Sequence, residues 1–179
     1  VEQADLIIGA RRMADAVALP GQDVFYEYRS AEIAEYIKKH PEYEKVVIAL
    51  SGDVGFYSGA KGLLKALDGN AEIICGISSV VYFMSKIGLS WDDAKIVSAH
   101  GRVCNLVSLI RTNQKVFAIL GTSDGTAHLA QKLTDYGIGE VQLYVGENLS
   151  YEDEKIFVKQ ARELTDYRGD ALSVICAWN

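Results

Sequence analysis

The chain has 179 residues, of which 49% are apolar and 23% charged, and its formal net charge is −6. This length and composition suit one sizeable globular domain or two small ones, and they exclude a disordered chain. The acidic balance argues against a nucleic-acid partner, which would need a basic face. No apolar run approaches the roughly 18 residues of a membrane span, so no membrane partner is expected.

Three cysteines, Cys75, Cys104 and Cys176, lie far apart and show none of the close spacings of a metal site. Two of them stand in apolar, strand-like surroundings, which indicates buried structural thiols. We therefore predict no protein metal site and expect a cytoplasmic compartment.

Strand-like runs alternate with helical patterns along the whole chain, which is typical of an α/β fold. In chain order the pattern predicts strands at 5–9 and 23–28, a helix at 31–39, a strand at 46–50, a helix at 59–67, a strand at 71–75, a helix at 79–87, a strand at 94–98, a helix at 104–111, a strand at 115–120, a helix at 126–136, and strands at 139–145, 155–159 and 172–177. The alternation restarts near residue 102, which predicts two domains, 1–101 and 102–179.

The most informative segment is the loop Ser51-Gly52-Asp53-Val54-Gly55-Phe56-Tyr57-Ser58, between a predicted strand and a predicted helix. Open α/β sheets place their ligand crevice at such loops. Glycines let the backbone approach a ligand, and the amides that follow can face it. By itself the pattern is as typical of a purely structural turn as of a ligand-binding loop. It is not a phosphate-binding loop, because no Gly-Lys-Ser/Thr follows.

Three segments resemble motifs of the tetrapyrrole methylases, which bind S-adenosylmethionine. Residues 51–58 resemble the family's Ser-Gly-Asp-Pro-Gly-Phe-Tyr-Ser loop, and Gly76-Ile77-Ser78-Ser79 resembles its Pro-Gly-Ile-Ser-Ser loop, with Cys75 in the place of proline. Residues 88–94 (Gly-Leu-Ser-Trp-Asp-Asp-Ala) and 98–102 (Ser-Ala-His-Gly-Arg) resemble the branch that methylates C5 of cobalt-precorrin-7. The resemblance runs in order along essentially the whole chain.

This resemblance implies two small α/β domains with the active site in the cleft between them, and a homodimer. It implies an S-adenosylmethionine-dependent C-methyltransferase of cobalamin biosynthesis, acting on C5 of a precorrin or cobalt-precorrin macrocycle whose cobalt belongs to the substrate. One departure is that family members open with a strand and a Gly-x-Gly-Pro-Gly loop, and the printed sequence contains neither.

The resemblance also assigns site residues. Those implied to bind the cofactor are Gly52, Asp53, Val54, Phe56, Ser78, Ser79, Leu120 and Ala177. Asp53 has a structural alternative as the cap of its own turn, and one of the two serines can cap a helix.

For the macrocycle, the resemblance implies a proton-transfer role for His100 and a substrate role for Tyr57 and Arg102. An imidazole titrates near neutrality, and a guanidinium binds a carboxylate with two parallel hydrogen bonds. A carboxylate-rich substrate needs cations gathered locally in so acidic a chain. The candidates are Arg11, Arg12, Lys61, Lys86, Arg102 and Arg111, of which we interpret Lys61, Lys86 and Arg111 as surface charges.

Methyl transfer from a sulfonium is an in-line displacement that needs positioning rather than a metal or a covalent nucleophile. Three alternatives stay open. The first is the N-terminal half of a bifunctional precorrin-6Y C5,15-methyltransferase, which the chain also resembles. The second is a methylase with another acceptor, such as uroporphyrinogen or a diphthamide precursor. The third is a catalytically silent binding module.

Overall fold

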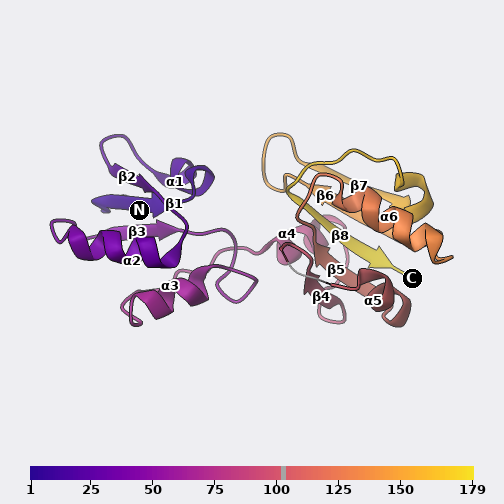
Figure 1. Cartoon of the computed structure of the whole chain (residues 1–179). Helices are drawn as coiled ribbons and strands as arrows, with labels where there is room; N and C mark the ends of the chain where they lie inside the picture. The colour runs from indigo at the N-terminus through magenta and orange to yellow at the C-terminus, as the bar shows by residue number, and fades with distance from the viewer. Residues whose placement is uncertain (102–103) are drawn as a thin grey trace. The chain divides into compact units, whose positions relative to one another are not determined.

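The computed structural model describes residues 1–101 and 104–179, and its contacts divide the chain into two compact units, Val1–Ser78 and Ser79–Asn179 (Figure 1). Each unit combines a β-sheet with helices, which confirms the α/β class. Residues 102 and 103 are outside the described ranges, so the predicted substrate residue Arg102 is not placed.

The contacts place the border before residue 79, whereas the alternation of elements predicts it after residue 101. Residues 79–101 join the second unit because strand β4 (Lys95–Ser98) is hydrogen-bonded in parallel to β5 (Lys115–Ile119). Phe83, which precedes β4, also lies 6.2 Å from Phe117 of β5, measured between ring centroids. A restart in the sequence pattern does not show which sheet a strand will join.

The first unit has three parallel strands in the order β2-β1-β3. They are β1 (Leu6–Gly9), β2 (Asp23–Tyr26) and β3 (Val46–Ala49). Its helices are α1 (Arg11–Val17), α2 (Ser30–Lys39) and α3 (Ala60–Ala66). Successive side chains of β1 point to opposite faces: Leu6 and Ile8 pack with Ile33 and Leu63 of α2 and α3, while Ile7 packs with α1. Both faces of this sheet are therefore covered, as parallel sheets require.

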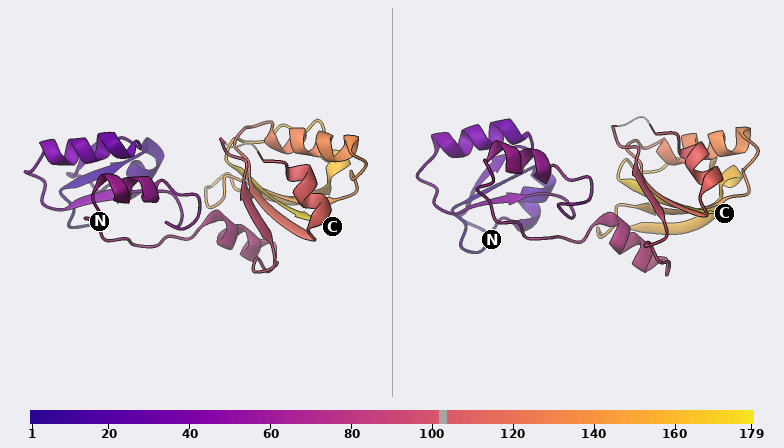
Figure 2. Two further views of the ribbon diagram at one scale, coloured as in Figure 1. Left: turned by 60° about the horizontal axis from the view of Figure 1, so that its bottom comes forward. Right: turned by 90° about the horizontal axis from the view of Figure 1, so that it is seen from below.

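The second unit has a five-stranded sheet in the order β4-β5-β8-β6-β7, antiparallel except for the β4–β5 pair. Its further strands are β6 (Gln142–Glu147), β7 (Lys155–Gln160) and β8 (Ser173–Trp178). Its helices are α4 (Ser79–Lys86), α5 (Leu106–Thr112), α6 (Gly125–Asp135) and the short 3-10 helix η1 (Ala161–Leu164). Helices α5, α6 and η1 share one core on one face of the sheet, and Phe83 of α4 packs against β5 and β6 on the other (Figure 2).

Two expectations from the sequence are wrong, namely the strand at 71–75 and the burial of the thiol of Cys75. The predicted strand at 71–75 is not a strand: none of the described strands pairs with it, and Ile73 and Ile74 are 46% and 89% exposed. An apolar run has strand propensity, but a strand forms only where a neighbour supplies hydrogen bonds. For the same reason Cys75 is exposed. Cys176 is buried as expected, and burial raises the pKa of its thiol to about 12.

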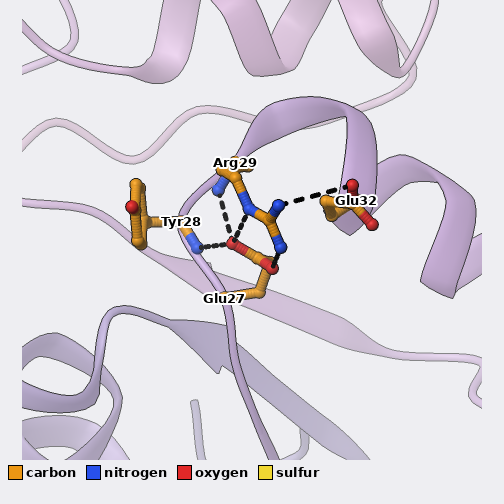
Figure 3. Close-up of polar contacts among 4 residues, drawn as sticks. All are labelled: Glu27, Tyr28, Arg29 and Glu32. Carbon is orange, nitrogen blue, oxygen red and sulfur yellow. Dashed lines mark hydrogen bonds and ion pairs between the residues drawn. The ribbon is translucent and has the colours of Figure 1, made fainter.

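The turn after β2 is held by the carboxylate of Glu27 (Figure 3). Its Oε1 accepts hydrogen bonds from the backbone N–H groups of Tyr28, at 2.8 Å, and Arg29, at 2.9 Å. The Arg29 guanidinium donates two further hydrogen bonds to this carboxylate, from Nε to Oε1 at 3.1 Å and from Nη2 to Oε2 at 2.6 Å. The Arg29 side chain, followed by the two amides, lowers the pKa of Glu27 to about 2. The carboxylate therefore fixes the backbone at the carboxyl end of β2.

We expect this turn to make the protein acid-sensitive. The folded-state pKa of Glu27 lies below its ordinary 4.5, so its stabilisation is present above that pH and is lost as the pH falls towards 2. Glu27→Gln should lower the free energy of unfolding at pH 7 and flatten its dependence on pH below 4.5. Urea unfolding at a series of pH values measures both quantities. The exposed Glu44→Gln is the matched control, and equal acid slopes for wild type and Glu27→Gln would contradict the assignment.

Candidate functional site

In the first unit, the loop 51–58 follows β3 at the edge of the sheet where all three parallel strands end. The side chain of Asp53 accepts a hydrogen bond from the Gly55 amide at 2.8 Å, and the Asp53 carbonyl accepts one from the Phe56 amide at 3.1 Å. Asp53 thus caps its own turn, as the structural interpretation predicts. This bond fixes the loop and leaves a ligand role for the loop backbone open.

Two residues of this loop have left-handed backbone: Gly52 with φ +71° and Tyr57 with φ +51°. Glycine adopts this conformation freely, but for a tyrosine it costs free energy. Tyr57 is 44% exposed, and its ring lies edge-on to that of Phe56 at 5.2 Å between centroids. Strain of this kind is common where a loop must present a particular shape to a ligand.

The second glycine motif lies directly against the first. A Cβ atom on Gly76 would come within 2.5 Å of the Gly52 carbonyl oxygen, and one on Gly52 would lie 3.7 Å from the Cα of Ser78. Ser78 is 4% exposed, whereas the neighbouring Ile77 is 73% exposed. The fold therefore brings together Gly52 and Ser78, two residues assigned to one cofactor site from segments well separated in sequence.

In the second unit, a similar edge is formed where β4 and β5 end. The amide of Ala99 donates to the Ile119 carbonyl at 2.9 Å, and that of Leu120 donates to Ser173 at 2.9 Å. The exposed His100 lies over Gly121: a Cβ there would meet the His100 Nδ1 at 2.7 Å. The fold thus places His100 beside the Leu120–Gly121 backbone, at the carboxyl ends of two parallel strands.

Other assigned residues lie elsewhere. Ala177 is 1% exposed in the core of the second unit and pairs with Val116, near the amino end of β5, which separates it from the edge that holds Leu120. Ser79 is the first residue of α4, in the second unit.

A cavity of about 980 Å³, here called the groove, is lined by residues of α5 and α6 and by Ala99, Gly101 and Gly121. Sequence reasoning missed it and interpreted its residue Arg111 as a surface charge. The signal lay in the spacing of His128 and Lys132, which puts both on one face of α6, with Tyr136 next along the same face at the C-cap of the helix. What the sequence could not show is that α5 packs beside that face.

Among residues 1–101 and 104–179, no three His, Cys, Asp or Glu side chains are grouped in a way that could hold a metal ion. Within the same ranges, no helix has both the length and the apolar character that crossing a membrane requires.

The fold and the glycine loops at the strand ends define an α/β protein built of two units. Residues 1–165 match the family model of the Tetrapyrrole (Corrin/Porphyrin) Methylases, so the chain belongs to this family and is a methyltransferase.

Relatives and a solved structure agree with this placement. The chain is 31% identical over 175 residues to the "Probable cobalt-precorrin-7 C(5)-methyltransferase" of Methanocaldococcus jannaschii, covering 93% of this chain and 82% of that protein. It is 28% identical over 179 residues to the "Cobalt-precorrin-7 C(5)-methyltransferase" of Salmonella typhimurium, covering 98% and 88%. The crystal structure of the uroporphyrin-III C-methyltransferase of Thermus thermophilus, complexed with S-adenyl homocysteine, matches with a TM-score of 0.72 at 18% identity, covering 99% of this chain and 87% of that one. At that identity the likeness shows the fold alone.

Proposed function

We propose that this methyltransferase uses S-adenosylmethionine to methylate C5 of a precorrin or cobalt-precorrin macrocycle in cobalamin biosynthesis. The observation that carries the proposal is the 31% identity, over 93% of the chain, to a relative named for that reaction. A second relative, with 28% identity, carries the same reaction name.

The geometry of the first unit fits the cofactor. The close approach of Gly76 to Gly52 leaves no room for a side chain between the two loops, so the backbone itself forms this surface. We propose that the backbone of Gly52, Asp53 and Val54, with Phe56 and Ser78, holds the methionine portion of S-adenosylmethionine. When bound, the cofactor supplies an electrophilic methyl group on sulfur.

The chain's task is then to hold the acceptor carbon in line with that methyl group and to exclude water. The electron pair of the macrocycle forms the new carbon–carbon bond, the sulfur keeps the electrons of the broken bond, and a proton must leave the methylated product. We propose that His100, exposed above Gly121, accepts that proton. Tyr57 and Arg102 keep a proposed substrate role, and Ser79 and Leu120 a proposed cofactor role, from the resemblance.

A single-turnover assay tests this proposal. Wild-type protein mixed with methyl-labelled S-adenosylmethionine and enzymatically prepared cobalt-precorrin-7 should place one label on C5, detected by mass and carbon NMR. His100→Ala should slow this step by about 10²- to 10⁴-fold, as expected for loss of a general base, with little change in S-adenosylhomocysteine affinity. His40→Ala, which changes a half-buried histidine of the first unit that pairs with Glu42, should react at the wild-type rate. No label on the macrocycle would refute the function, and a full rate for His100→Ala would refute the role of His100.

We also propose, from the resemblance, that the protein is a cytoplasmic homodimer. Light scattering should report twice the mass of the 19.6 kDa chain at micromolar concentration, and a mass of one chain would contradict the dimer.

A further inference from the structure

The groove between α5 and α6 has an apolar floor. Its buried lining residues are Leu106 and Val107 of α5, Leu129 of α6 and Leu120 after β5, with exposed fractions of 8%, 8%, 4% and 4%. Its volume of about 980 Å³ is at the upper end of the range of about 300–1,000 Å³ for small-molecule sites. The groove can therefore hold a ligand with a large apolar surface.

The walls of the groove carry positive charge and polar groups. Arg111, in the last turn of α5, and Lys132, on α6, are exposed side chains that line it, together with His128 one helical turn before Lys132. Ser108 and Thr112 add hydroxyl groups. None of the lining residues in the described part of the chain is Asp or Glu, although acidic residues outnumber Lys and Arg, 24 to 18, in the whole sequence.

The two cations are not neutralised within the unit. Among the described ion pairs, none within 4.0 Å joins Arg111 or Lys132 to a carboxylate, whereas Lys86, Lys115, Lys155 and Arg162 of the same unit each have an acidic partner. Two such cations on facing helices, above an apolar floor, favour a ligand with an apolar centre and several negative groups. An inorganic anion would leave the floor unused.

We propose that this groove binds the carboxylate side chains and part of the ring of the tetrapyrrole, with Arg111 and Lys132 as the carboxylate contacts and His128 as a further hydrogen-bonding group. This inference rests on the proposed function. Ala99 and Gly101, the residues on either side of His100, line the groove, so the groove lies next to the proposed proton acceptor in the chain.

The test compares two corrins that differ in charge. Cobyrinic acid carries carboxylates around the ring, and cobinamide carries amides in their place. In titrations followed by tryptophan fluorescence, wild-type protein should bind cobyrinic acid at least about tenfold more tightly than cobinamide, because charge-assisted bonds are lost with the amides. The difference should shrink as salt is raised.

The double variant Arg111→Gln/Lys132→Gln should weaken cobyrinic acid binding by about tenfold or more and leave cobinamide binding unchanged. Its affinity for S-adenosylhomocysteine should equal that of wild type. Lys159→Gln, which removes an exposed cation of the same unit outside the groove, is the matched control. Circular dichroism checks that each variant is folded, which we expect because both changed side chains are exposed.

Two outcomes would overturn the inference: a double variant that binds cobyrinic acid as tightly as wild type, or wild-type protein that does not distinguish the two corrins. Neither outcome bears on whether the wild-type protein transfers a methyl group. Failure of the proposed function would instead appear as absence of label on C5 in the single-turnover assay.

Discussion

Gly52→Val is expected to weaken S-adenosylhomocysteine binding by about 10- to 100-fold, corresponding to backbone strain of roughly 1–3 kcal/mol. The backbone at Gly52 has φ +71°, a conformation that a β-branched residue avoids. The new Cβ would lie 3.7 Å from the Cα of Ser78, and the two methyl groups of valine would extend into the remaining space. The loop should therefore move away from Ser78. Calorimetric titration with S-adenosylhomocysteine measures the loss.

Gly59→Ala is the control for this change. Gly59 lies seven residues after Gly52, at the N-cap of α3, has an ordinary φ of −67°, and has no atom within 4 Å of an added Cβ. Its cofactor affinity should match that of wild type. If Gly52→Val binds as tightly as Gly59→Ala, the placement of the cofactor on this loop is wrong.

Loss of Glu147, in the second unit, should cost stability. It ends β6, is fully buried, and accepts hydrogen bonds from the Tyr167 hydroxyl at 2.9 Å and from the Asp170 amide at 3.1 Å. Burial, followed by the hydrogen bond to the Glu147 carboxylate, raises the pKa of Tyr167 to about 12. Gly169 lies so close to the carboxyl group that a Cβ there would overlap it. Glu147 therefore anchors the loop 167–170.

That loop supports the edge that holds the candidate site. The Gly169 amide donates to the Ser123 carbonyl at 3.2 Å, in the turn that follows Leu120 and Gly121. Glu147 also pairs in register with Ser173, whose carbonyl accepts the Leu120 amide. A change at Glu147 should therefore reach the site through the backbone.

Glu147→Ala is expected to lower the free energy of unfolding by about 2–4 kcal/mol, because it leaves two part-buried donors without their acceptor and a cavity in place of a fully buried side chain. Urea unfolding measures the change. The exposed Glu152→Ala, in the turn before β7, should change stability by less than about 0.5 kcal/mol. Equal stabilities for the two variants would show that Glu147 does not anchor the loop.

Three features were hard to predict from the sequence, because each depends on contacts between distant segments. Residues 71–75 have the composition of a strand but lack a hydrogen-bonded neighbour among the described strands. The resemblance assigns Ala177, at the end of the last strand, to the cofactor site, and its pairing with Val116 buries it in the core of the second unit. Arg111 is exposed, as the sequence interpretation has it, but nothing local shows that it lines a groove between α5 and α6.

By itself the sequence determined the α/β class, most helices and strands, and the glycine loop at 51–58, because hydrophobic periodicity and glycine-rich turns are local properties. Its motifs also identified the family that residues 1–165 match. Only the tertiary structure decided that β4 joins the second sheet, that Gly76 and Ser78 lie against Gly52, that His100 covers Gly121, and that a cationic groove opens between two helices. Strand pairing, close backbone approach and groove formation join residues far apart in the chain, and the free energy that selects them comes from packing and hydrogen bonds that no single segment contains.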